Sequence, residues 1–261
     1  MTTRTTFSFT RRPLVPYAHD YPHGASEPWH EHDCAQLLHI LTGVARVDTP
    51  SGSWVVPPGR GVWLPAGTRH ALRLTGQVAA RTLFIDPLAR ADLPASCQIV
   101  QITPLLRELI VASLALEEEE EEYAPGSRDE RIYELILDEI RVMAVLPFGL
   151  PEPTGDNLRQ LCSRMRDDPA GDWCSARAAK LVNMSERTLN RRFQQQTSLT
   201  WGEWARRARL LEALVRLAQG QPVLKVALEL GYGSHSAFTT MFRRVMGISP
   251  SDYFHNESSS G

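Results

Sequence analysis

The chain has 261 residues, enough for two domains, since single domains most often hold roughly 100–150. Hydrophobic residues make up 43% and charged residues 22%, a composition typical of soluble globular proteins that excludes the disordered and fibrous classes. The net charge of −2 hides an asymmetry: residues 1–155 carry 13 basic and 20 acidic side chains, whereas residues 156–255 carry 15 and 9. The second half is therefore the candidate nucleic-acid binder.

Nothing in the sequence indicates secretion or insertion into a membrane. No apolar run approaches the ~20 residues of a membrane helix, and the N-terminus lacks the apolar core and cleavage pattern of a signal peptide. We therefore expect a cytoplasmic protein. Cys34, Cys97, Cys162 and Cys174 are scattered without CxxC spacing, which favours reduced thiols over disulfides or a zinc–thiolate site.

Residues 1–102 are expected to form an all-β barrel or sandwich. Short β-type runs alternate with glycine and proline, as in GVARVDTPSGSWVVPPG at residues 43–59. Within that stretch, Thr49-Pro50-Ser51-Gly52 predicts a hairpin turn.

The segment 103–146 is expected to hold two antiparallel helices. Thr103 and Pro104 fit the N-cap and first turn of one helix. Ser127 with Glu130 predicts a capping box for the other. Hydrophobic residues recur at helical spacing after both starts, so each helix has one apolar face.

Residues 147–155 are expected to be a linker, because three prolines and two glycines in nine residues do not suit a helix or a strand. Residues 156–255 have a helical pattern throughout. The predicted fold is thus a two-domain α+β protein with a β-barrel and two helices before the linker and an all-α domain after it.

Residues 175–195 predict a helix-turn-helix. A short helix ends at the turn Val182-Asn183, and Ser185 caps a second helix whose Leu189 and Phe193 would be buried. The other face of this helix is polar and of the kind that contacts bases; it contains Arg187, Asn190, Arg191 and Gln194.

The pattern repeats 49 residues later, which indicates an internal duplication. The matched pairs are Ala178/Ala227, Leu181/Leu230, Ser185/Ser234, Leu189/Phe238, Phe193/Phe242, Leu199/Ile248 and Trp204/Tyr253. In the second copy Gly231 supplies the turn and His235 begins the helix, whose polar face contains Ser236, Thr239, Thr240 and Arg243. Two ordinary amphipathic hairpins are the alternative, and two matched copies argue against it.

The sequence VALELGYGSHSAFTTMFRRVMGISPSDYF resembles the C-terminal signature of AraC/XylS-type regulators. The resemblance implies two helix-turn-helix subdomains, joined by a helix from about Trp201 to Ala218, that contact adjacent major-groove segments ~34 Å apart. It places base contacts at Arg187, Asn190, Arg191, His235, Ser236, Thr239 and Thr240. Phosphate contacts are assigned to Arg192, Arg206, Arg207, Arg209, Arg243 and Arg244. The chain departs from the family at Asn183 and Ser198, where glycine is usual.

The N-terminal half resembles a cupin barrel. Gly24-X5-His30-X-His32-X3-Gln36-X6-Gly43 matches the first cupin motif in spacing, and Gly59-X5-Pro65-X-Gly67-X2-His70 matches most of the second. His30 and His32 share one face of a strand, and a barrel would bring His70 and Gln36 opposite them. Three imidazoles and an amide oxygen suit a divalent transition metal, although Gln36 stands where metal cupins have Glu, and Leu74 where Asn is usual. Alternatively, the histidines line an organic-ligand pocket, which Trp29, Trp54 and Trp63 could flank if they are not core.

The sequence therefore predicts a transcription regulator and not an enzyme. The barrel would sense a small molecule or a metal, the two helices would form a homodimer, and the C-terminal domain would bind double-stranded promoter DNA and could contact RNA polymerase as an activator. Whether it activates or represses stays open. A metal-dependent cupin enzyme fused to a DNA-binding domain is the alternative, and a barrel that only dimerises is a third.

Overall fold

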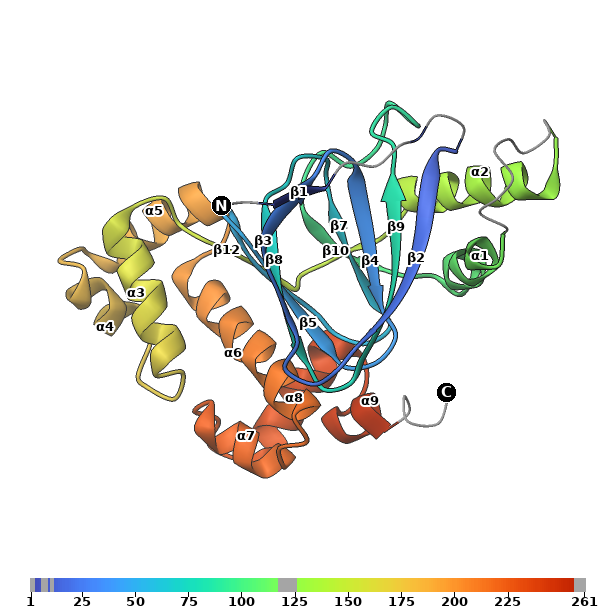
Figure 1. The fold of residues 1–261 in the computed structure, drawn as a ribbon. Helices are drawn as coiled ribbons and strands as arrows, with labels where there is room; N and C mark the ends of the chain where they lie inside the picture. The colour runs from blue at the N-terminus through green and yellow to red at the C-terminus, as the bar shows by residue number, and fades with distance from the viewer. Residues whose placement is uncertain (1–2, 6–8, 10–11, 117–125, 256–261) are drawn as a thin grey trace. The chain divides into compact units, whose positions relative to one another are not determined.

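The computed structural model describes residues 3–5, 9, 12–116 and 126–255 and divides the chain into two compact units. The N-terminal unit comprises Met1–Pro50 and Trp54–Gly149, and the C-terminal unit comprises Ser51–Ser53 and Leu150–Gly261. The elements of both are labelled in Figure 1. As the sequence predicts, strands dominate the first unit and helices form the second.

Two six-stranded sheets contain the strands, which lie in the N-terminal unit except for parts of β6 and β12. The first sheet has the order β1-β3-β8-β5-β6-β12, and the second has the order β11-β10-β7-β4-β9-β2. The strands are β1 (Thr3–Thr5), β2 (Leu14–Tyr21), β3 (Ser26–His32), β4 (Ala35–Ile40), β5 (Val44–Thr49), β6 (Gly52–Val56), β7 (Arg60–Leu64), β8 (His70–Thr75), β9 (Val78–Ile85), β10 (Gln98–Gln101), β11 (Val145–Leu146) and β12 (Gly149–Pro151). The predicted hairpin turn at Thr49–Gly52 joins β5 to β6 and is confirmed.

Strand β4 in the second sheet is buried on both faces. Ala35 and Leu37 belong to one apolar cluster with Leu106 and Ile110 of the helices that cover this sheet. Because side chains alternate along a strand, the intervening Gln36 points away from those helices. The second sheet therefore has one helix-covered face and one face that carries polar side chains inside the unit.

The two helices that cover the second sheet are α1 (Pro104–Leu114) and α2 (Arg128–Arg141) (Figure 1). Their predicted caps are confirmed: Thr103 accepts from the backbone N–H of Leu106, and Ser127 accepts from that of Glu130. The predicted capping box is only half formed, because the Glu130 carboxylate accepts from the N–H of Gly126 and not from that of Ser127.

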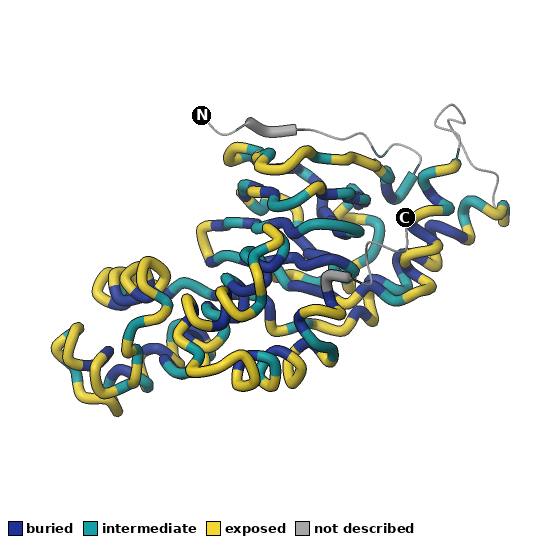
Figure 2. The backbone as a smooth tube through the Cα atoms, turned by 90° about the horizontal axis from the view of Figure 1, so that it is seen from below, coloured by how far each residue is buried: buried dark blue, intermediate teal, exposed yellow. Residues whose placement is uncertain are grey.

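The C-terminal unit contains all of the remaining helices, and buried residues lie along one side of them in Figure 2. They are α3 (Asp156–Asp167), α4 (Ser175–Leu181), α5 (Glu186–Thr197), α6 (Trp201–Ala218), α7 (Val223–Glu229), α8 (His235–Met246) and α9 (Pro250–His255). In its core Phe193 packs edge-on against Trp201 and Trp204, with ring centroids 5.5 and 5.9 Å apart.

In the two helix-turn-helix copies, residues after the turn match in burial at a spacing of 49, whereas not all residues before the turn do. Leu189 and Phe193 of the first copy are fully buried, as are Phe238 and Phe242. The predicted pair Leu181/Leu230 is wrong, since Leu181 is 42% exposed and Leu230 is fully buried. The second turn is one residue longer. The hydrogen bond from Met184 to Ala179 after α4 has its counterpart 48 residues later, from Tyr232 to Ala227. The N-caps that follow, Ser185 and Ser234, are 49 residues apart.

The segment between the units is more ordered than a flexible linker. Strand β12 lies inside the predicted linker 147–155, and Phe148 donates a backbone hydrogen bond to Leu146. Proline is tolerated here because β12 is an edge strand. Among the described residues, no helix combines the length and the apolar character needed to cross a bilayer.

Candidate nucleic-acid interface and metal centre

The first candidate recognition helix, α5, begins at its predicted N-cap and ends at a left-handed serine. The hydroxyl of Ser185 accepts from the N–H of Thr188, which confirms the predicted N-cap. At the other end Ser198 adopts a left-handed conformation with φ 60° and donates its N–H to Gln194. Gly247 ends α8 in the same way with φ 81°, so the first copy uses serine where the second uses glycine.

Three matched positions form the exposed polar face of each recognition helix. On α5 they are Arg187, Arg191 and Gln194, and on α8 they are Ser236, Thr240 and Arg243, each set at i, i+4 and i+7. His235, also exposed, is the first residue of α8. These side chains can donate to base edges, and arginine can pair with guanine through two hydrogen bonds.

The fourth predicted position turns inward in both copies. Asn190 donates to the carbonyl of Glu186 at 3.1 Å and accepts from the N–H of Trp201 at 3.2 Å. Its counterpart Thr239 has a buried hydroxyl oxygen with no hydrogen-bond partner among the described residues. The sequence predicts base contacts for both side chains; in this structure Asn190 bonds within the unit and the hydroxyl oxygen of Thr239 is buried.

The predicted phosphate-contacting arginines fall into two groups. Arg192, Arg206, Arg243 and Arg244 are exposed. Arg209 instead donates to the carbonyls of Pro169 at 2.8 Å and Gly171 at 3.2 Å, and so holds the loop before α4. Arg207 is only partly exposed, and burial lowers its pKa.

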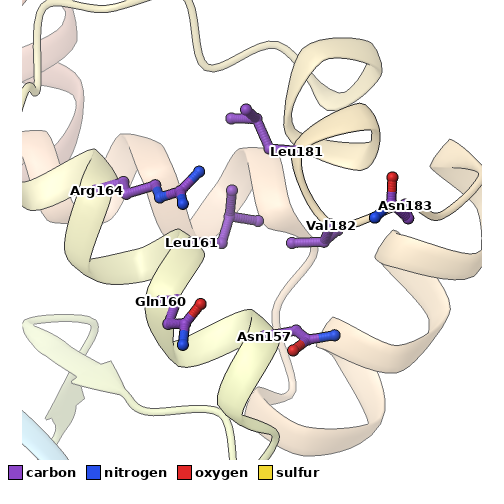
Figure 3. A pocket seen from close by; sticks show the side chains of 7 residues that line it. All are labelled: Asn157, Gln160, Leu161, Arg164, Leu181, Val182 and Asn183. Carbon is purple, nitrogen blue, oxygen red and sulfur yellow. The ribbon is translucent and has the colours of Figure 1, made fainter.

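A small cavity of about 140 Å³ lies between α3 and the turn after α4 (Figure 3). Drug-sized ligands need about 300 Å³ or more, so this cavity is too small for such an effector. The residues that line it are Asn157, Gln160, Leu161 and Arg164 of α3 with Leu181 of α4 and Val182 and Asn183 of the turn. Asn183 takes a left-handed conformation with φ 53°, as expected where glycine is usual.

In the N-terminal unit, three histidines meet between the sheets. His30 and His32 lie on β3, and His70 on β8 is the direct cross-strand partner of His30. One ring nitrogen from each lies within 4.8 Å of those of the other two. His32 also contacts the ring of Phe84 on the second sheet, with centroids 5.1 Å apart. His70 thus meets His30 as expected, and it does so as the neighbour of His30 in the same sheet.

Backbone carbonyls orient two of these imidazoles. The Nδ1 atom of His30 lies 2.7 Å from the carbonyl of Pro28, and that of His70 lies 2.7 Å from the carbonyl of Thr68. A carbonyl can only accept, so each Nδ1 donates and each Nε2 offers a lone pair. The pKa values of His32 and His70 are lowered to about 4, chiefly by burial and further by neighbouring imidazoles.

The predicted fourth ligand, Gln36, lies on the same side of β4 as the interior of the unit. It pairs in register with Phe84, whose ring contacts His32. Its side-chain oxygen and the Nε2 atom of His70 are both buried and have no hydrogen-bond partner among the described residues. Unsatisfied buried acceptors of this kind are costly, and a cation would satisfy them. The three converging imidazoles therefore fit a divalent transition metal, and Gln36 is a candidate fourth donor from the facing strand.

The three tryptophans considered for the pocket have different surroundings. Trp63 is fully buried in the apolar cluster beneath α1 and α2, and Trp54 is also buried. Trp29 is 37% exposed and lies under the guanidinium of Arg69, 5.1 Å from the ring centroid. None of these contacts places a tryptophan at the histidines.

The structure adds Glu27, which no sequence motif indicates. Its carboxylate lies 3.5 Å from Nε2 of His30 and accepts a hydrogen bond of 2.5 Å from Tyr21. Simple alternation along β3 would put Glu27 and His30, three residues apart, on opposite faces, but a register shift lies between them. No motif in the sequence marks that irregularity.

Comparison with known proteins gives consistent matches over both units. Residues 13–136 match the AraC-like ligand binding domain, and residues 178–256 match a helix-turn-helix domain. The HTH-type transcriptional regulator NimR of Escherichia coli (strain K12) is 32% identical over 228 residues, which cover 87% of this chain and 82% of NimR. Regulatory protein SoxS of Salmonella typhimurium is 41% identical over 78 residues, 30% of this chain and 73% of SoxS. The structure of ToxT from Vibrio cholerae covers 94% of this chain and 98% of its own, with 12% identity and a TM-score of 0.39.

Proposed function

This chain belongs to the AraC family of transcription regulators, and we propose that a divalent transition metal held by its histidine cluster controls its binding to promoter DNA. It is a DNA-binding regulator with an N-terminal ligand-binding domain. The observation that carries the proposal is the convergence of His30, His32 and His70, with the buried oxygen of Gln36 as a further donor.

The histidines would hold the metal through their Nε2 atoms where Nδ1 is already bonded to a carbonyl, as at His30 and His70. Bound there, the metal would act as the effector or as the anchor for an organic effector. Either ligand can shift the regulator only if it binds one arrangement of the protein more tightly than another. We propose a regulatory and not a catalytic role for this site.

The exposed triplets on α5 and α8 are our candidates for contacts with bases. Arginine favours guanine and glutamine favours adenine. On α5 we therefore expect guanine contacts from Arg187 and Arg191 and an adenine contact from Gln194. The exposed Arg192, Arg206 and Arg244 are candidates for phosphates, which position the protein without selecting a sequence.

We also propose that α2 contributes to a homodimer. Leu135 of α2 and Val142, the C-cap residue that follows the helix, are 45% and 66% exposed. Exposed apolar side chains at the end of a helix are covered when a second copy packs against them. Leu135→Glu should shift the protein toward monomer in analytical ultracentrifugation; an unchanged mass would exclude this face.

Metal content tests the main proposal. Protein purified without chelator or a histidine tag should contain near-stoichiometric metal by elemental mass spectrometry. The His30→Ala/His70→Ala variant should lose it, and His19→Ala, on an exposed part of β2, should keep it. DNA affinity should differ between the metal-loaded and metal-free forms of the wild type and not of the double variant. Absence of metal after supplementation would contradict the proposal. Turnover of a candidate ligand would instead support an enzymatic role.

A further inference from the structure

A β-bulge turns Glu27 toward the histidine face of β3. Glu27 pairs with Leu72 of β8 and His30 pairs with His70, so three steps along β3 correspond to two steps along β8. The extra residue reverses the alternation and places Glu27 and His30 on the same face. That face is also the one that carries Leu72 and His70, which are two residues apart on β8.

The Glu27 carboxylate is held at one oxygen and directed at a histidine with the other. Its Oε1 accepts from the Tyr21 hydroxyl at 2.5 Å, and its Oε2 lies 3.5 Å from Nε2 of His30. The side chain is 34% exposed, against 12% for that of His30. Glu27 therefore lies at the edge of the cluster between the solvent and the buried histidines.

The separation of 3.5 Å is informative because both atoms are acceptors when His30 is neutral. His30 uses its Nδ1 proton on the carbonyl of Pro28, so its Nε2 lone pair faces the carboxylate. Two neighbouring ligands with bonds of about 2.0–2.2 Å to one metal lie about 2.8–3.6 Å apart, depending on the angle between the bonds. A metal bonded to both atoms fits the observed separation.

We propose that Glu27 is a ligand of the metal and supplies the negative charge that Gln36 lacks, with Tyr21 as its positioning residue. The inference rests on the proposed metal site. The three imidazoles and the amide are neutral donors, so one carboxylate would halve the charge of a divalent cation at the site. Tyr21 comes from β2 in the other sheet, and its hydrogen bond limits the rotation of the carboxylate.

The test measures Zn²⁺ affinity of the full chain by chelator competition and the visible spectrum of the Co²⁺-loaded protein. Glu27→Gln keeps the shape and an acceptor for Tyr21, and it should weaken Zn²⁺ binding about 10–100-fold and change the Co²⁺ spectrum. Tyr21→Phe should weaken binding by a smaller factor. Glu31→Gln, on the opposite face of β3, is the matched control and should bind as the wild type does. Glu27→His, which exchanges one ligand type for another, should recover most of the affinity.

Three outcomes separate the proposals. Loss of affinity in Glu27→Gln with recovery in Glu27→His supports Glu27 as a ligand. Equal affinity of Glu27→Gln and the wild type, with binding abolished in His30→Ala/His70→Ala, would overturn the role of Glu27 and leave the metal site standing. A wild type that binds neither Zn²⁺ nor Co²⁺ would overturn both.

Discussion

The side chain of Asn190 on α5 caps the next helix, because its oxygen accepts from the backbone N–H of Trp201, the first residue of α6. That N–H has no partner within α6. Asn190→Ala should therefore lower the free energy of unfolding by about 1–2 kcal/mol in urea titrations. It should weaken binding to specific and random DNA by similar factors. Unchanged stability with altered sequence preference would instead make Asn190 a base contact.

Arg191, the next residue, is exposed and tests the proposed base contacts. On a site selected from random-sequence DNA, Arg191→Ala should cost about 1–3 kcal/mol and relax preference at one or two positions. Arg192→Ala is the matched control for a phosphate contact. It should weaken binding to all sequences alike, and it should lower the slope of log affinity against log salt concentration by about 1 in magnitude. Full affinity in Arg191→Ala at several salt concentrations would exclude its assignment.

The left-handed residue after α5 offers a way to stabilise the protein. Ser198 has φ 60° where α8 ends in Gly247 with φ 81°. Since this conformation costs a residue with a Cβ about 1 kcal/mol, Ser198→Gly should raise the free energy of unfolding by up to that amount. Gly247→Ser should lower it similarly. Thermal and urea unfolding measure both variants. A less stable Ser198→Gly or a more stable Gly247→Ser would contradict the explanation.

Thr239 carries a buried hydroxyl that has no hydrogen-bond partner in the described part of the chain, so removing that hydroxyl should not destabilise the protein. Thr239→Val keeps the shape, and we expect a gain of between zero and about 1 kcal/mol in unfolding free energy with unchanged DNA preference. Thr240→Val, on the exposed face, should show the reverse: unchanged stability and altered preference. A loss of specific binding in Thr239→Val would restore it as a base contact.

His39 should make the N-terminal unit less stable in acid. It is buried on the helix-covered face of β4, and its pKa is lowered from 6.5 to about 4, chiefly by burial and also by Arg107 of α1 and Arg81 of β9. Between these values the unfolded chain binds a proton that the folded chain does not, so stability falls as the pH drops from 6.5 toward 4. The loss should approach about 3 kcal/mol.

The measurement is urea unfolding from pH 7.5 to 4.5, compared with that of His39→Leu. Over this range the wild type should lose about 3 kcal/mol more unfolding free energy than the variant, because the other titrating groups contribute equally to both. Parallel pH profiles for the two proteins would show that His39 is not buried in its neutral form.

Local sequence patterns predicted the helix ends and the duplicated motif because each depends on neighbouring residues. Ser185 and Ser234 cap their helices in the predicted way, through bonds to residues three positions on. The histidine motif likewise identified His30, His32 and His70, although not that His70 would be a neighbour of His30 in the same sheet.

What the sequence could not reveal depends on contacts between distant elements. The inward turn of Asn190 requires the position of α6, and its polar character gave no indication of that partner. Glu27 reaches His30 only through a bulge, which no residue type marks. Leu181 was paired with Leu230 because the one-residue difference between the two turns appears only in the backbone hydrogen bonds.

The two recognition helices share one geometry but not one chemistry: Arg187, Arg191 and Gln194 correspond to Ser236, Thr240 and Arg243. With the base contacts that we propose, a DNA segment that suits the first triplet is a poor match for the second. The DNA sequence recognised by one protein chain, through both helix-turn-helix units, would consist of two unlike halves in a fixed order, with no palindrome within it. Such a site has a direction, so inverting it in front of a promoter would turn the bound protein around and present a different surface to whatever binds beside it.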